Sequence, residues 1–220
     1  MARTGTTQPK GRTSGFTLKK EQKALTKQIK KKEKKEKNVS KIPFKPKQER
    51  EDVAKAQPKG PRYTFALKNL QNWVKNHTDA TAEEKQTILS QILSDEFPEF
   101  SFVGFYDAKE GDSKKIYIGE YVSNGDIFPC GEIEYGKGQC GLCASTKKVL
   151  IAHDTKLLEN YISCDQFTRS EIVLPVLNAD GSFKTQLDID SPNVGTFDAE
   201  DQKWLEELLR VIYWSFLLIS

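Results

Sequence analysis

The chain has 220 residues, a formal net charge of +3, four cysteines and a hydrophobic fraction of 37%. This length suggests one domain with an appendage rather than two full domains. No apolar run reaches the roughly 18–20 residues that span a bilayer, and the start lacks the apolar core of a secretory signal. We therefore expect no membrane association and a cytoplasmic location.

Charge is divided very unevenly along the chain. Residues 1–60 carry 19 basic and 6 acidic residues, a net charge of +13, whereas the remainder has a net charge of −10. The first part is too polar to bury enough apolar surface for folding. We predict a basic, largely disordered arm and linker over residues 1–62 and one folded domain over residues 63–220. The lysine cluster at 30–37 is suited to nucleic acid or to another acidic polymer such as a microtubule, with a nuclear or cytoskeletal location as the consequence.

Helices are predicted at both ends of the folded part. Apolar residues recur at helical spacing from Thr64 onward. A second helix begins at Thr81, which forms a capping box with Glu84. Asp198 caps a long final helix. The apolar tail at 212–220 is too short to cross a membrane, and we expect it to be buried against the N-terminal helices or a second subunit.

Short β-like segments separated by turns occupy the middle of the folded part. We predict strands at 100–107, 115–122, 132–135, 149–152, 171–177 and 183–190, with short helical segments at 144–147 and 157–161. A turn at Gly111 should join the first two strands into an antiparallel hairpin. This pattern predicts an α+β fold, with an antiparallel sheet and helices packed on one face.

Three cysteines and several carboxylates gather between Cys130 and Ser191. Cys130, Cys140 and Cys164 lie near glycine-bordered turns, a pattern that suits a thiolate and a resolving thiol in sulfoxide or peroxide reduction. Nearby carboxylates could supply a proton or bind an ammonium group. They would raise a neighbouring thiol's pKa, so we expect them to serve the substrate rather than to activate the cysteine.

Other interpretations of the cysteines are weaker. Cys140 and Cys143 have the CxxC spacing of a zinc site or a redox dithiol, but a second CxxC pair and the flanking βαβ context are missing. We therefore expect no bound metal. Cys143 is interpreted as a small buried hydrophobic residue.

The domain resembles the free methionine-(R)-sulfoxide reductases, which are built on a GAF domain, over about residues 64–212. The motifs that carry this resemblance are Val-Gly-Phe-Tyr at 103–106, Gly-Lys-Gly-Gln-Cys-Gly at 136–141, Ile-Ser-Cys-Asp at 162–165, Ser-Glu-Ile-Val-Leu-Pro at 170–175 and Leu-Asp-Ile-Asp-Ser at 187–191. The resemblance implies that free methionine-(R)-sulfoxide enters an enclosed pocket and is attacked at sulfur by a thiolate.

The resemblance also implies roles for individual residues. Cys164 would attack and Cys130 would resolve, with Cys140 a second resolving thiol that could exchange roles with Cys164. The substrate would be held and protonated by Glu171, Asp188 and Asp190, in a pocket lined by Phe102 and Tyr106. No cofactor would be bound. Thioredoxin, recharged with NADPH by its own reductase, would reopen the disulfide, and the protein would pair as a homodimer.

The sequence departs from the family pattern at four places, one of which is a loop before Cys130 that is longer than usual. Phe102 stands where the family has Trp, Asn160-Tyr161 replaces Gly-His, and Thr185-Gln186 replaces Gly-Val, a change that could alter the strand. These departures leave a second hypothesis: a weak or inactive GAF-fold adaptor, anchored by its arm to a microtubule, a cilium or a ribonucleoprotein. A GAF domain that senses a ligand without catalysis is a third, less favoured because a sensor needs no thiol triad.

Overall fold

The computed structural model describes residues 58–123, 127–159, 161–162 and 166–213. All of them belong to one compact unit of the chain, Phe44–Ser220. Its helices are α3 (Lys59–Asn76), α4 (Ala82–Glu96), α5 (Gly138–Thr146) and α6 (Ala199–Tyr213), with a 3₁₀ turn at Thr155–Leu157. Its strands are β1 (Phe102–Lys109), β2 (Asp112–Ser123), β3 (Glu132–Glu134), β4 (Leu150–Ala152), β5 (Ser170–Leu177) and β6 (Phe183–Ser191).

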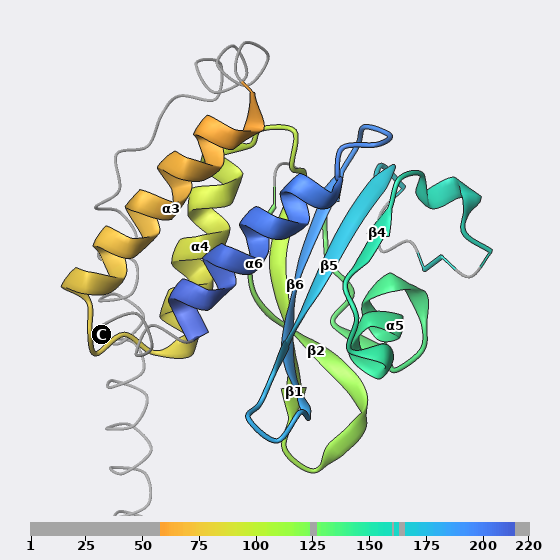
Figure 1. Ribbon diagram of the computed structural model, residues 1–220. Helices are drawn as coiled ribbons and strands as arrows, with labels where there is room; N and C mark the ends of the chain where they lie inside the picture. The colour runs from red at the N-terminus through yellow and green to blue at the C-terminus, as the bar shows by residue number, and fades with distance from the viewer. Residues whose placement is uncertain (1–57, 124–126, 160, 163–165, 214–220) are drawn as a thin grey trace, which may run out of the picture. The chain divides into compact units, whose positions relative to one another are not determined.

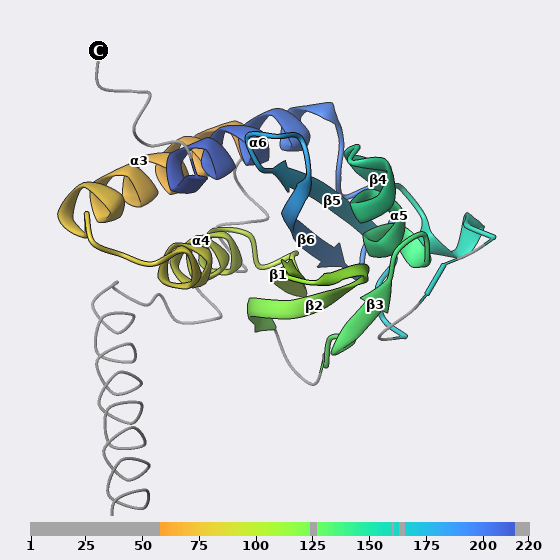
Figure 2. The ribbon, with the colours of Figure 1, turned by 90° about the horizontal axis from the view of Figure 1, so that it is seen from below.

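The six strands form one sheet in the order β3-β2-β1-β6-β5-β4, and all neighbouring pairs are antiparallel. Helices α3, α4 and α6 cover one face, whereas α5 lies on the other (Figures 1 and 2). The α+β prediction is confirmed, but the expectation that the helices share one face is wrong for α5. The predicted boundary between residues 62 and 63 falls inside α3.

Residue alternation along the strands divides the core into two layers. Phe105 on β1 and Leu187 on β6 are partners in register, and both are completely buried. Since side chains alternate between the two faces of a strand, Tyr106 and Asp188 project to the opposite side from Phe105 and Leu187. Tyr106 packs in the cluster that includes the cysteines of α5.

Local signals set several helix ends as predicted. The capping box at the start of α4 is present, with Thr81 accepting from the backbone N–H of Glu84 and the Glu84 carboxylate accepting in return. At the start of α6 the Asp198 carboxylate accepts from the N–H groups of Glu200 and Asp201. These bonds satisfy backbone donors that the first turn of a helix leaves without intrahelical partners.

Polar contacts join the helices of the covering layer. The Asp201 carboxylate on α6 is fully buried and accepts hydrogen bonds from the Tyr63 hydroxyl at 2.8 Å and from the Lys59 ammonium group at 2.7 Å. Arg62 on α3 forms a forked pair with Glu99 and lies over the ring of Phe97, 4.1 Å from its centroid. The buried carboxylate is thus compensated by charge and hydrogen bonds, as a buried ion requires.

Three local predictions were wrong. The segment 157–161 was expected to be helical, but the helical turn is a 3₁₀ turn at Thr155–Leu157, because Asp154 caps it at the backbone N–H of Lys156. Helix α5 starts at Gly138, six residues before the predicted 144–147 segment. Strand β6 runs through Thr185 and Gln186 with partners on both sides, so these side chains do not interrupt it.

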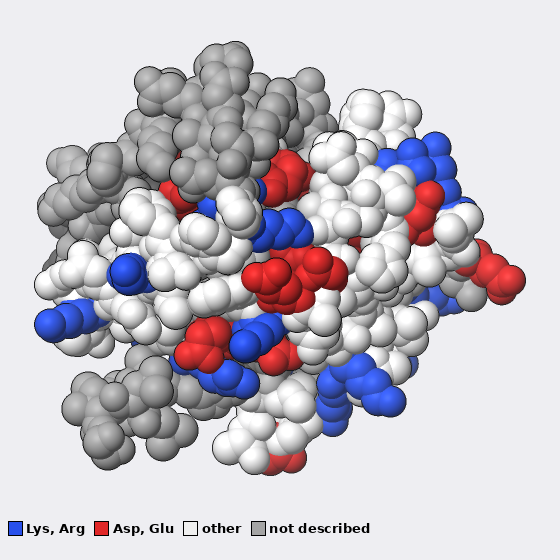
Figure 3. Space-filling model, turned by 45° about the horizontal axis from the view of Figure 1, so that its top comes forward, with Lys and Arg blue, Asp and Glu red and all other residues white. Residues whose placement is uncertain are grey.

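Acidic and basic side chains are interspersed on the face shown in Figure 3. Among the described helices, none combines the length and the apolar character needed to cross a membrane. The predicted burial of the tail at 212–220 holds for Ile212, which is 4% exposed, while residues 214–220 lie outside the described part.

Candidate active site

A pocket opens between α5 and the face of the sheet that α5 covers. Its volume is about 450 Å³ when counted out to open solvent. The lining residues come from the sheet, α5 and two loops: Phe102, Tyr106, Ile127, Phe128, Pro129, Ile133, Lys137, Gly138, Gln139, Cys140, Tyr161, Ile162, Glu171, Asp188 and Asp190. Six of the eight predicted site residues are in this set.

Strand register brings the three carboxylates of the pocket together. Glu171 on β5 pairs directly with Asp190 on β6, and Asp188 lies two residues from Asp190 on the same strand. Residues two apart on a strand share a face, and register partners lie side by side, so all three carboxylates face α5. Glu171 and Asp188 are each 5% exposed. A cluster of acids this deeply buried favours a cationic partner.

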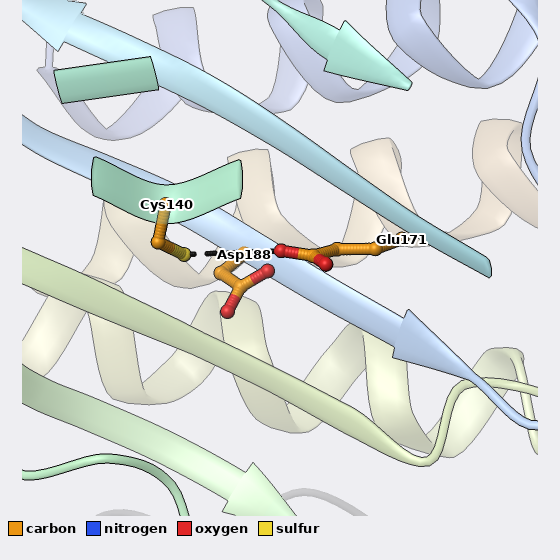
Figure 4. A group of neighbouring side chains, drawn as sticks. All are labelled: Cys140, Glu171 and Asp188. Atoms are coloured by element: carbon orange, nitrogen blue, oxygen red, sulfur yellow. Dashed lines mark hydrogen bonds between the residues drawn. The ribbon is translucent and has the colours of Figure 1, made fainter. Parts of the chain in front are cut away.

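Cys140 lies against two of these acids, as Figure 4 shows. Its Sγ atom is 4.0 Å from Oε1 of Glu171, the thiol donating, and the ligand atoms of Cys140, Glu171 and Asp188 all lie within 4.8 Å of one another. Burial, followed by the charges of Asp188 and Glu171, raises the pKa of the Cys140 thiol well above its ordinary value. Cys140 is therefore held as a thiol rather than a thiolate.

Two glycines allow α5 to approach this closely. A Cβ atom on Gly141 would collide with the backbone carbonyl oxygen of Glu134, so only glycine fits there. Gly138 adopts a φ of +60° and packs against Ile162, where a Cβ would come within 3.1 Å of the Ile162 Cβ. Both positions need glycine for close approach or for the left-handed backbone.

The predicted cysteines have different surroundings. Cys140 and Cys143 are free thiols inside α5. Cys140 was expected on a glycine-bordered loop, but it lies in the first turn of this helix. Cys143 is fully buried, as predicted. Cys130 is disulfide-bonded and packs against the cluster that contains Cys140. The predicted attacking residue, Cys164, lies outside the described residues.

The remaining predicted residues form the walls of the pocket. Phe102 is 2% exposed and its ring stacks against Tyr121, with 5.7 Å between centroids. Tyr106 is also 2% exposed, and burial raises the pKa of its hydroxyl. Thr185 and Gln186 do not line the pocket; the Thr185 hydroxyl donates to the backbone carbonyl of Tyr106 instead.

Sequence reasoning did not identify Tyr161 as a site residue. The Tyr161 ring lines the pocket and its hydroxyl hydrogen-bonds the Glu171 carboxylate. Burial, and then the charge of Glu171, raises the pKa of this hydroxyl, which therefore remains a donor. The sequence shows that Tyr161 departs from the family pattern, but it does not show that this residue lines the pocket.

A divalent cation is the other ligand that the acidic cluster could take. The thiol of Cys140 and the carboxylates of Glu171 and Asp188 offer one sulfur and two oxygen atoms, a mixture that zinc accepts. Cys143 is not in this group, so the CxxC pair does not act as a unit here.

Comparisons with known proteins agree with the fold. No family model matches the chain. The chain is 33% identical over 150 residues to protein YtsP of Bacillus subtilis, a match that covers 68% of this chain and 88% of that protein. It is 31% identical over 141 residues to the free methionine-R-sulfoxide reductase of Saccharomyces cerevisiae, covering 64% of this chain and 74% of that protein.

Solved structures give the same result. A structure of free methionine-R-sulfoxide reductase from Neisseria meningitidis in complex with its substrate is 26% identical, with a TM-score of 0.65, and covers 74% of this chain and 92% of that one. A structure of a GAF domain is 27% identical, with a TM-score of 0.63, and covers 70% and 88% of the two chains. The predicted GAF-like fold is therefore confirmed.

Proposed function

Because this chain belongs to the free methionine-R-sulfoxide reductase family, we propose that it reduces free methionine-(R)-sulfoxide to methionine. The observation that carries the proposal is the convergence of Cys140, Glu171 and Asp188 within 4.8 Å of one another at one pocket. Cys130 packs against the hydrophobic cluster that contains Cys140, and its neighbour Pro129 lines the pocket.

The polarity of the pocket suits an amino acid zwitterion. Three carboxylates on one wall would bind the ammonium group of the substrate. The first turn of α5 and Lys137 also line the pocket, and their backbone N–H groups and positive charge favour a carboxylate. Phe102 and Tyr106 supply apolar contacts for the rest of the molecule.

The reaction would proceed in three steps. A thiolate attacks the sulfoxide sulfur while an acid of the pocket delivers a proton to the oxygen; methionine leaves, and the attacking cysteine keeps the oxygen as a sulfenic acid. A second thiol then displaces water from the sulfenic acid and forms a disulfide. Thioredoxin reduces this disulfide to two thiols and becomes oxidised itself, and its reductase restores it with NADPH.

We assign the attack to Cys164 and the resolution to Cys130. The surroundings of Cys140 support this assignment, since burial and two carboxylates hold it as a thiol and a thiol is a poor nucleophile. Cys140 instead donates a hydrogen bond to the Glu171 carboxylate, which helps to hold that acid in place on the wall of the pocket. A homodimer remains a prediction from the family resemblance.

A coupled assay tests the proposal. The purified protein, thioredoxin, thioredoxin reductase and NADPH are mixed with the R or the S epimer of free methionine sulfoxide, and the absorbance of NADPH is followed. We expect oxidation of NADPH with the R epimer alone, its loss in Cys164→Ser and its retention in the matched control Cys143→Ala. Absence of turnover with the R epimer would refute the function, and full activity of Cys164→Ser would refute the assignment of the nucleophile.

The charge of the arm supports a separate role. A net charge of +13 over residues 1–60 is not required by sulfoxide reduction and is suited to an anchor on a polyanion. Deletion of residues 1–57 should leave turnover intact and abolish co-sedimentation with microtubules or RNA at low salt. Binding that is insensitive to salt would argue against an electrostatic anchor.

A further inference from the structure

The thiol and two carboxylates of the pocket are arranged as a set of metal ligands. The Sγ atom of Cys140 is 4.0 Å from Oε1 of Glu171, and the ligand atoms of Cys140, Glu171 and Asp188 all lie within 4.8 Å of one another. Around a tetrahedral zinc ion, one sulfur and two oxygen ligands are separated by about 3.4–3.6 Å. Small rotations of the three side chains are therefore enough to bring their ligand atoms onto one ion.

Each ligand comes from a separate element, so the set is held in place before an ion arrives. Cys140 is in the first turn of α5, which the contact of Gly141 with β3 fixes, while Glu171 and Asp188 stand on the paired strands β5 and β6. All three ligands are 5% exposed, and all three line the pocket. The fourth coordination position therefore faces the pocket, where a water molecule can fill it.

The chemistry of the set selects the kind of ion. A thiolate and two carboxylates carry three negative charges, which favour a divalent cation. Magnesium and calcium take oxygen ligands, whereas zinc accepts the sulfur of a cysteine together with oxygen. Lys137 is the only lysine or arginine in the described lining of the pocket, so little positive charge opposes the ion.

A buried amide beside this set points to the same conclusion. Gln186 lies two residues before Asp188 on β6, so both side chains are on the face toward α5. Gln186 is completely buried, and neither atom of its amide has a hydrogen-bond partner among the described residues. Carboxylates that bind a metal receive hydrogen bonds from outer-shell groups. The Gln186 N–H group is placed to donate such a bond to Asp188.

We propose that Cys140, Glu171 and Asp188 bind a zinc ion, and that this ion excludes the substrate from the pocket. On binding, the Cys140 thiol releases its proton to solvent and forms the Zn–S bond, with no change of oxidation state. Zinc then occupies two of the carboxylates that would hold the ammonium group of the substrate, so it inhibits by competition. The competition rests on the proposed function, whereas the binding of zinc does not.

Calorimetry tests the ligand set. Zinc chloride is titrated into the full-length protein without added thiols, and we expect one ion per chain in the wild type and in the matched control Cys143→Ala, whose thiol is outside the set. Cys140→Ser should raise the dissociation constant about a hundredfold, because even outer-shell partners contribute about 10- to 100-fold. Equal affinity in the wild type and Cys140→Ser overturns the proposal.

The role of Gln186 has its own test. Gln186→Leu should weaken zinc binding about tenfold, yet leave the urea midpoint of the metal-free protein equal or higher, because the amide that it removes has no partner there. An unchanged affinity for zinc would overturn the outer-shell role.

A spectroscopic measurement identifies the sulfur ligand. Cobalt(II) is added in place of zinc, since a thiolate bound to cobalt gives a charge-transfer band in the near ultraviolet. The band should form in the wild type and in Cys143→Ala and be lost in Cys140→Ser. A wild-type protein that binds cobalt without this band overturns the thiolate ligand.

Single turnover tests the exclusion of the substrate, because it needs neither thioredoxin nor its reductase. The reduced protein is mixed with the R epimer of free methionine sulfoxide, and the methionine formed is measured by chromatography with zinc, with magnesium or without metal. Zinc alone should suppress product formation, and excess sulfoxide should restore it. Inhibition that excess sulfoxide does not relieve overturns the competition. A protein that binds zinc through Cys140 but forms no methionine without metal counts against the proposed function alone.

Discussion

Replacing Asp188 by Asn should make Cys140 more reactive while it impairs reduction of the sulfoxide. Burial is the main cause of the raised pKa of Cys140, and the Asp188 charge is the next. The variant removes that charge and keeps the size of the side chain, so the thiol should ionise at lower pH. The same change removes one of the three carboxylates proposed to hold the substrate, and kcat/KM for the sulfoxide should fall.

The magnitude follows from the distance. The ligand atoms of Cys140 and Asp188 are no more than 4.8 Å apart. At an effective dielectric constant of about 20, two unit charges at this distance repel by roughly 3.5 kcal/mol, so removing one of them should raise the thiolate fraction at fixed pH by a factor of about 300. A thiolate loses nucleophilicity as its pKa falls, with a Brønsted coefficient of about 0.4–0.5, so the net gain in alkylation rate at fixed pH is about twentyfold.

The assay is the rate at which iodoacetamide alkylates Cys140. This rate is measured between neutral and alkaline pH in the wild type and in Asp188→Asn. The exposed Asp79 provides the control variant Asp79→Asn, which should behave as the wild type. If Asp188→Asn folds normally but its Cys140 reacts no faster at any pH, then the carboxylate does not hold the proton on the thiol, and Cys140 becomes a candidate for the attacking cysteine.

Three further substitutions test the framework of the site. Gly141→Ala places a Cβ against a backbone carbonyl, so it should displace α5 and lower the free energy of unfolding by about 1–3 kcal/mol. The control Gly131→Ala has open space around it and should be near neutral. Equal urea midpoints for the two variants would contradict this prediction. Tyr63→Phe leaves the buried Asp201 without one of its donors and should cost about 1.5–3 kcal/mol in urea unfolding, so a neutral result would mean that the bond contributes nothing. Thr81→Ala removes the cap of α4 and should cost about 1 kcal/mol; an unchanged melting temperature would show that the cap is dispensable.

The features predicted correctly depend on neighbours in the sequence. The capping box of Thr81 and Glu84 is a contact over three residues, so it can be recognised without knowledge of the fold. The turn at Gly111, with a φ of +81°, likewise joins β1 and β2 as expected. Alternation along β6 also places Asp188 and Asp190 on one face of the strand.

The position of Cys140 shows where such reasoning stops. Three glycines around it suggested a loop, but the residue lies in a helix, because glycine was needed there for close packing against Glu134 rather than for flexibility. Glu134 is near Gly141 in the sequence, but it belongs to β3, the strand at the edge of the sheet. The contact between the two residues therefore depends on how α5 packs against that edge.

The sequence by itself determined the kinds of groups in this protein: the thiols, the carboxylates, the aromatic walls and the elements that carry most of them. Tertiary structure decided which of these groups meet. Strand register placed Glu171 beside Asp190, and the packing of α5 put Cys140 against Glu171. The hydroxyl of Tyr161 reaches the same carboxylate. Burial then sets the chemistry, because the same thiol and acids in water would titrate independently, whereas in a pocket of low dielectric constant each charge shifts its neighbour.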